Sequence, residues 1–160
     1  MIVLGIDPGI ASCGWAIIET EKNQNSIILK SCGVIKTSPN LSLGKRLNIL
    51  DTELKKIIAE FNPSIAIVEE IFFAKNVKTA IIVGHARGVV ILSCSQMGLN
   101  ICEFTPLQIK QAITGFGHAT KEQISYMLKN LLKLKELPKD DNTTDAIATG
   151  ICYINTNKFK

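Results

Sequence analysis

Three groups of acidic side chains stand next to apolar segments of this sequence, where carboxylates are uncommon. The groups are Asp7, the pair Glu69 and Glu70, and the cluster Asp140, Asp141 and Asp145. A carboxylate beside a buried strand costs several kcal/mol unless it is paired or coordinates a cation. Oxygen ligands suit Mg²⁺ or Mn²⁺ better than zinc. Two such ions about 4 Å apart can activate a water and stabilise the leaving oxygen in phosphodiester hydrolysis. Together, the three groups favour metal-dependent chemistry on a nucleic acid.

Each group taken alone also has an ordinary structural explanation. Asp7 precedes a Pro-Gly turn, where Asp is common, and the glutamate pair can be a solvated strand end. Asp141 and Asp145 can favour a helix N-terminus through its dipole, with Asn142 as the N-cap. The chemistry therefore depends on the three groups meeting in space, which adjacent strand ends and the start of a packed helix can bring about.

Apolar patterning predicts the elements that position these groups. Strands are expected at residues 2–6, 14–18, 26–36, 65–68 and 100–104. Helices are expected at residues 43–61, at 77–97, from a capping box at residues 120–123 onward, and at about 143–153. Short links should make the first three strands antiparallel. The later alternation of strand and helix then predicts an α/β fold, a five-stranded mixed sheet with helices on both faces.

Composition limits the class of protein. With 160 residues, 46% hydrophobic and 20% charged, the chain is expected to form one domain over residues 1–160 rather than a disordered segment. Five cysteines without a CxxC pair argue against a disulfide scaffold or zinc ribbon and favour a reduced, cytoplasmic location. We expect no signal peptide and no membrane span. The formal charge of +4 permits a polyanionic partner.

Four segments, in order and at fitting spacing, resemble the successive motifs of RuvC-type Holliday junction resolvases. They are LGIDPG at residues 4–9, IVEEIFFAKN at 67–76, GHARG at 84–88 and TDAIA at 144–148. The resemblance covers nearly the whole chain, and the second segment is distinctive. It implies an RNase H-like fold and a homodimer whose paired active sites nick opposed strands of a four-way DNA junction, in recombination and repair. It also implies Mg²⁺ and cooperation with the RuvA and RuvB branch-migration proteins.

By motif position, Asp7, Glu69 and Asp145 correspond to three of the family's four metal-binding, catalytic carboxylates. The fourth position departs from the family, because Asn142 stands where a carboxylate belongs. On a helix, Asp141 lies about 40° from Asp145 and Asn142 about 60° away on the other side. Asp141 can therefore replace the missing ligand, or Asn142 can bind metal through its carbonyl oxygen, or the chain is a catalytically impaired junction-binding protein. We expect two Mg²⁺ ions per subunit, replaceable by Mn²⁺.

Several residues are expected to contact the DNA. The resemblance places Lys110 and Lys121 near the scissile phosphate and Phe72 against an unpaired base, while Lys75 follows the second acidic strand end. The alternatives are that the lysines lie on solvated helix faces and that Phe72 packs in the core. His118 receives no role.

Two further expectations stay open. His85 is expected in the core or at a subunit interface. A nuclease of the same fold that acts on RNA in RNA/DNA hybrids is the remaining alternative function.

Overall fold

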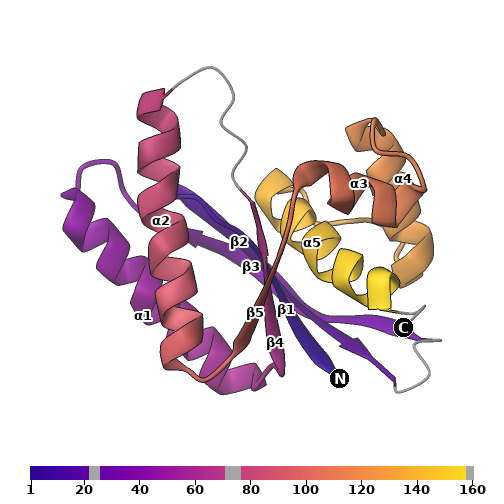
Figure 1. Cartoon of the computed structure of the whole chain (residues 1–160), viewed down its shortest axis with the longest axis horizontal. Helices are drawn as coiled ribbons and strands as arrows, with labels where there is room; N and C mark the ends of the chain where they lie inside the picture. The colour runs from indigo at the N-terminus through magenta and orange to yellow at the C-terminus, as the bar shows by residue number, and fades with distance from the viewer. Residues whose placement is uncertain (22–25, 71–76, 158–160) are drawn as a thin grey trace.

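A computed structural model describes residues 1–21, 26–70 and 77–157, which form one five-stranded sheet flanked by helices (Figure 1). The strands are β1 Ile2–Asp7, β2 Ser12–Thr20, β3 Ile27–Lys36, β4 Ile65–Glu69 and β5 Asn100–Phe104. The helices are α1 Leu43–Phe61, α2 Val77–Gln96, α3 Pro106–Thr114, α4 Lys121–Leu132 and α5 Asp141–Asn157.

The sheet has the order β3-β2-β1-β4-β5 and is mixed. β1, β2 and β3 pair antiparallel, whereas β4 is parallel to both β1 and β5. The predicted α/β class and the mixed five-stranded sheet are confirmed.

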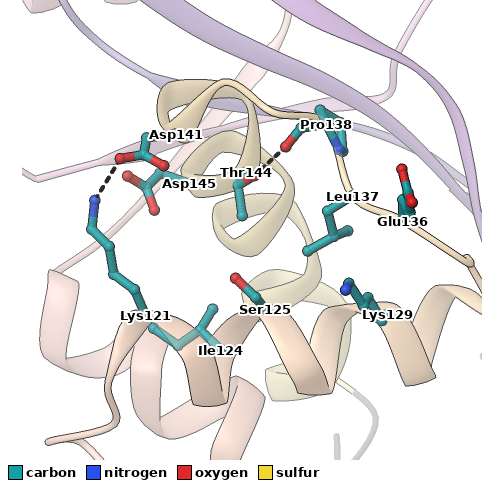
Figure 2. A pocket seen from close by; sticks show the side chains of 10 residues that line it. All are labelled: Lys121, Ile124, Ser125, Lys129, Glu136, Leu137, Pro138, Asp141, Thr144 and Asp145. Atoms are coloured by element: carbon teal, nitrogen blue, oxygen red, sulfur yellow. Dashed lines mark hydrogen bonds and ion pairs between the residues drawn. The ribbon is translucent and has the colours of Figure 1, made fainter.

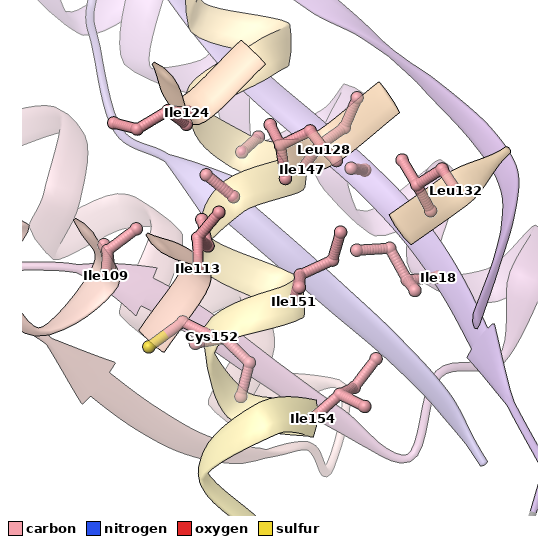
Figure 3. Packing of buried hydrophobic residues seen from close by; sticks show 14 of the residues in the cluster. Ile18, Ile109, Ile113, Ile124, Leu128, Leu132, Ile147, Ile151, Cys152 and Ile154 are labelled. Carbon is pink, nitrogen blue, oxygen red and sulfur yellow. The ribbon is translucent and has the colours of Figure 1, made fainter. Parts of the chain in front are cut away.

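Helices cover both faces of the sheet, α1 and α2 on one and α3, α4 and α5 on the other (Figure 1). Side chains alternate between the faces along each strand. In β1, Val3 packs into the core beneath α5, while Leu4 packs into the core beneath α1 and α2. Figure 3 shows the first of these cores, where Ile147 and Ile151 of α5 meet Leu128 of α4.

α5 lies unusually close to the sheet because glycines face it. A Cβ atom on Gly5 would lie 2.2 Å from the carbonyl oxygen of Ala146, and one on Gly14 would lie 1.9 Å from the carbonyl oxygen of Asn142. Any side chain at these two strand positions would push the helix away. The glycines of β1 and β2 therefore fix the height of α5 above the strand ends.

Most of the predicted elements are present, with different bounds. β2 is longer than predicted, and α5 begins two residues earlier and ends four later. The predicted capping box starts α4, because the Thr120 side chain accepts from the Gln123 N–H and the Gln123 side chain accepts from the Thr120 N–H. An equivalent box, Thr105 with Gln108, starts α3. The bounds of that nine-residue helix were not predicted, because it is too short for a clear apolar period.

The face of α2 that points away from the sheet is uncovered in the single chain, where Ile81 and Leu92 are 54% and 53% exposed. No helix in the part of the chain described is long and apolar enough to cross a membrane.

Candidate active site

Asp7 and Glu69 end two neighbouring parallel strands. The register pairs Ile6 of β1 with Val68 of β4, so each carboxylate follows directly after that pair at the same edge of the sheet. Side chains alternate between the two faces of the sheet along each strand, so the position of each carboxylate in its strand determines the face to which it points. Gly5 faces α5, and so does Asp7, two residues further along β1. The same period places Glu69 on the face of Ile67, which belongs to the core beneath α5.

The first turn of α5 completes this edge. Gly14 pairs with Asp7 across the antiparallel strands, and the place of its missing Cβ is occupied by the backbone and Cβ of Asn142. The helix therefore begins directly over the strand position beside Asp7. Asp145 follows Asn142 by less than one turn and is half-buried.

Electrostatics shows that the three carboxylates share one environment. Burial, followed by repulsion from Asp145 and Asp140, raises the pKa of Asp7 to about 7, with Lys121 opposing the rise. Burial and repulsion from Asp7 and Asp145 raise the pKa of Glu69 to about 7. Burial is also the main cause of the raised pKa of Asp145. The ionised forms of these three carboxylates are therefore disfavoured unless a cation neutralises them.

Asp140 was assigned no role from the sequence. Its Oδ1 accepts hydrogen bonds from the backbone N–H groups of Asn142, at 3.0 Å, and Thr143, at 3.4 Å, so it caps the start of α5. Asp140 is therefore the capping residue, and the suggestion that Asn142 is the N-cap was wrong. This capping role could have been predicted from the sequence, because Asp is a favoured N-cap residue. Its side chain accepts from backbone N–H groups two or three positions further on.

The two candidates for the fourth ligand position lie differently. The Asp141 side chain is 77% exposed and accepts a hydrogen bond from the Lys121 ammonium group at 3.0 Å. The Asn142 amide is half-buried, and its Nδ2 donates to the Ser12 hydroxyl at 2.8 Å. Of the two, Asn142 is the one packed against the strand position that pairs with Asp7.

Two of the expected DNA-binding lysines lie within electrostatic range of the carboxylates. Lys110 of α3 lowers the pKa values of Glu69 and Asp145, and Lys121 of α4 lowers those of Asp7 and Asp145, although neither effect outweighs burial. Positive charge is thus present beside the acidic edge.

The other two expected DNA contacts, Phe72 and Lys75, fall outside the described residues. The two histidines are described. His118 is exposed, and its ring contacts that of Phe116 edge-to-face at 5.8 Å. His85 is exposed as well, so the core is excluded as its location.

A cavity of about 370 Å³ opens beside Asp145, between α4 and α5 (Figure 2). Lys121 and Lys129 of α4 line it together with Asp141 and Asp145 of α5, and Figure 2 shows the Lys121 side chain reaching Asp141 at its rim. Positive and negative side chains therefore line the same cavity, which Asp145 borders and which Asp7 and Glu69 do not line.

The donor set fits a hard divalent cation with an open coordination shell. Within residues 1–21, 26–70 and 77–157, no three His, Cys, Asp or Glu side chains are gathered closely enough to enclose a metal by themselves. Mg²⁺ is usually held by one or two carboxylates, with water and substrate phosphate filling the other positions. The charge accumulated at Asp7, Glu69 and Asp145 agrees with that mode of binding and disagrees with a closed structural site.

Comparison with known proteins agrees with this geometry. The family described as "Crossover junction endodeoxyribonuclease RuvC" matches residues 3–153. A protein of that name from Caldicellulosiruptor saccharolyticus is 52% identical over 154 residues, covering 96% of this chain and 92% of the relative. The structure of Thermus thermophilus RuvC superposes with a TM-score of 0.92 at 32% identity, covering 99% of this chain and 96% of that one. A second structure shows T. thermophilus RuvC in complex with a Holliday junction substrate, with a TM-score of 0.92 at 31% identity and the same coverage.

These matches show the class of protein to which the chain belongs, because it has the RNase H-like fold of the junction-cutting nucleases. It belongs to the RuvC family of crossover junction endodeoxyribonucleases.

Proposed function

We propose that this chain is a structure-selective endonuclease that resolves four-way DNA junctions by paired hydrolytic nicks, in homologous recombination and DNA repair. The observation that carries the proposal is that Asp7 and Glu69 at one sheet edge and Asp145 at the start of α5 lie within electrostatic range, with pKa values raised chiefly by burial. Membership of the RuvC family and the T. thermophilus relative solved on a Holliday junction support the choice of DNA substrate.

The proposed cofactor is Mg²⁺, two ions per subunit, with Mn²⁺ able to substitute. Asp7, Glu69 and Asp145 would hold the ions as catalytic ligands, with the neutral carbonyl oxygen of Asn142 at the fourth position. Asp141 is the weaker candidate, because its side chain is exposed and paired with Lys121. Bound divalent cations supply the Lewis acidity that activates water and stabilises the leaving 3′ oxygen.

The chain's own side chains hold the substrate. Lys121 and Lys110 stand beside the carboxylates and are proposed to bind the phosphates that flank the scissile bond. Each lysine–phosphate contact releases counterions, which makes binding salt-dependent. Phe72 and Lys75 are proposed to contact the junction from the segment that follows β4.

The proposed assembly is a homodimer formed through α2. Ile81 and Leu92 are each more than half exposed, and with His85 and Gly88 they fall at steps of three and four along one side of the helix. Ile81 and Leu92 are apolar surface that a second copy of the chain would remove from water. A second copy of the chain would cover it and would supply the paired active sites that two opposed nicks require. RuvA and RuvB are proposed as further partners by the family resemblance.

A second candidate function rests on Asn142. An amide at a position that holds a carboxylate in the family weakens the attraction for a cation, so a chain that binds junctions but cuts them poorly is the alternative.

One experiment separates these functions. The purified protein is incubated with a labelled four-way junction, a linear duplex and an RNA/DNA hybrid of matched length, in Mg²⁺ and in Mn²⁺. We expect paired nicks in the junction alone, ending in 5′-phosphate and 3′-hydroxyl groups, and no nicks from Asp7→Asn although it still binds. Binding without product in either metal would support the impaired alternative, whereas preferential cleavage of the hybrid would contradict the junction assignment.

A further inference from the structure

A second cavity lies between α4 and the loop that joins α3 to α4, and none of the three carboxylates of the active site lines it. Its volume is about 390 Å³. The loop contributes Phe116 and Ala119 to its wall, and α4 contributes Glu122, Tyr126 and Met127. Cavities of about 300–1,000 Å³ with apolar and aromatic walls and a few polar groups are typical of sites for small organic groups.

Two aromatic side chains of this cavity are uncovered in the single chain. Phe116 is 60% exposed and Tyr126 is 67% exposed. The ring of Phe116 contacts that of His118 edge-to-face, but this contact leaves most of Phe116 in water. A flat apolar group that entered the cavity would cover both rings and remove their area from water.

Backbone hydrogen bonds hold Phe116 in place before any ligand binds. Its N–H donates to the Thr114 hydroxyl at 3.1 Å, and its carbonyl oxygen accepts from the Ala119 N–H at 3.3 Å. Gly115, in the left-handed region at φ 76°, ends α3 directly before Phe116, and the capping box at Thr120 starts α4. A ring presented on a preformed loop loses little conformational freedom when it binds a ligand.

The cavity lies next to the proposed phosphate site. Lys121 lines the cavity that Asp145 borders, and the next residue, Glu122, lines this one. Consecutive Cα atoms are about 3.8 Å apart, and the phosphates of one strand of a DNA helix are about 3.4 Å apart along its axis. A strand held by Lys121 therefore brings the bases of neighbouring nucleotides within reach of the two rings.

The chemistry of the wall favours a base over the DNA backbone. Of all the residues that line the cavity, Glu122 alone is charged, and its carboxylate repels a phosphate. Every base has an aromatic face that stacks on such rings, and enzymes hold bases that leave the helix between aromatic or apolar side chains. Resting on the proposed function, we propose that Phe116 and Tyr126 form a stacking site for one unpaired base of the junction. The base is unpaired because a paired base is already stacked between its neighbours.

An abasic scan of the junction tests the proposal. Binding of the full-length protein is measured by fluorescence anisotropy without divalent cations, on an intact four-way junction and on junctions that each lack one base near the branch point. We expect Phe116→Ala to weaken binding of the intact junction about tenfold, and Phe116→Tyr, which keeps an aromatic ring, to stay within about twofold of wild type. At the position whose base occupies the cavity, loss of the base should weaken wild-type binding about tenfold and Phe116→Ala binding less than twofold.

The controls separate stacking from charge and from folding. The slope of log K against log salt should be the same in Phe116→Ala and wild type, because no phosphate contact is lost. Leu43→Ala is the matched control, since Leu43 is 41% exposed at the start of α1, on the opposite side of the sheet. It should leave binding unchanged. Tyr126→Ala, on the α4 side of the cavity, takes the place of Phe116→Ala if the latter lowers the thermal midpoint.

The outcomes are distinct. Equal affinity of wild type and Phe116→Ala for the intact junction overturns the stacking site and leaves the uncovered rings to a protein partner. A loss in Phe116→Ala that is the same at every abasic position also overturns it, because the contact would then not involve a base. If the proposed function itself fails, the wild-type protein will bind the four-way junction no more tightly than a linear duplex of the same length.

Discussion

Lys121, the first residue of α4, donates a hydrogen bond at 3.0 Å to Asp141, the first residue of α5. The bond to Asp141, with the further negative charge of Asp145 and Asp7, raises the pKa of Lys121, so its ammonium group stays charged. Both side chains of the pair are mostly exposed, 71% for Lys121 and 77% for Asp141. An exposed pair contributes about 1 kcal/mol or less to stability. Lys121 can therefore exchange Asp141 for a DNA phosphate at little cost.

Replacing Lys121 by Ala should weaken junction binding and flatten its salt dependence. We expect the slope of log K against log salt to fall by about 0.9, the effect of one lost phosphate contact, with little change in thermal midpoint. Fluorescence anisotropy over a series of salt concentrations measures both quantities. Lys56→Ala on α1 is the matched control, because Lys56 is exposed on the opposite side of the sheet and pairs with Glu53. An unchanged slope in Lys121→Ala would contradict the phosphate contact.

Asp7→Asn should stabilise the metal-free protein while it abolishes cleavage. The pKa of Asp7 is raised to about 7 from an ordinary value of 3.8, so the folded chain holds this proton more tightly than the unfolded chain does. Below about pH 4 the carboxyl group is protonated and does not lower the free energy of unfolding. Its ionisation lowers that free energy increasingly as the pH rises to 7, and by the full amount above pH 7. Discounted for partial exposure, that cost is about 2–4 kcal/mol.

The difference in thermal midpoint between Asp7→Asn and wild type measures this cost. Without metal, we expect the variant to melt about 5–10 °C higher at pH 8 and at the same temperature at pH 4. Added Mg²⁺ should close the gap at pH 8, because only the wild-type chain gains from the cation. A variant that melts lower than wild type at pH 8 would show that the buried charge is already compensated within the chain.

Gly14→Ala should disturb the active site through the backbone. The new Cβ would meet the carbonyl oxygen of Asn142 at 1.9 Å, a distance that forces α5 away from β2. We expect a loss of several kcal/mol in stability, as in other overpacked sites, together with loss of cleavage. Gly44→Ala in α1 is the matched control, because nothing lies within 4 Å of its added Cβ, and there we expect a gain of about 0.5–1 kcal/mol. Urea unfolding of both variants measures the difference, and equal effects would refute the close contact.

The sequence was sufficient for some of this architecture and insufficient for other parts. The apolar runs before Asp7 and Glu69 placed both carboxylates at strand ends from the sequence, and the parallel pairing of these strands brings the two ends to one edge. The orientations of Asp141 and Asn142 could not be predicted in the same way. Helical angle alone favoured Asp141, whereas the structure pairs the Asp141 side chain with Lys121 and the Asn142 side chain with Ser12. Those partners lie 20 and 130 residues away, so only the tertiary fold reveals them.

Leu92→Glu should convert the proposed dimer to a monomer. Leu92 is 53% exposed on α2, and a carboxylate there would be buried without a partner when a second copy covers the helix. Sedimentation velocity at micromolar concentration should show a single species of half the wild-type mass. Leu107→Glu on α3, at the same 53% exposure, is the matched control and should leave the mass unchanged. If both variants and wild type sediment alike, α2 is not the interface.

Asn142→Asp should increase metal affinity and decrease metal-free stability at the same time. A fourth carboxylate would join Asp7, Glu69 and Asp145, whose pKa values are already raised by burial and by the neighbouring negative charges. The added charge attracts Mg²⁺ more strongly, so half-maximal junction cleavage should require about tenfold less Mg²⁺. The same charge increases repulsion, so the metal-free thermal midpoint at pH 8 should fall by a few degrees.

The opposite signs of these two effects identify an electrostatic cause. Asn142→Ala serves as the control, because it removes the amide oxygen without adding charge. We expect that variant to need more Mg²⁺ than wild type, and its metal-free midpoint to lack the pH-dependent decrease that an added carboxylate produces. If Asn142→Asp and Asn142→Ala shift the Mg²⁺ requirement in the same direction, position 142 acts through packing against Gly14 and not as a ligand to the cation.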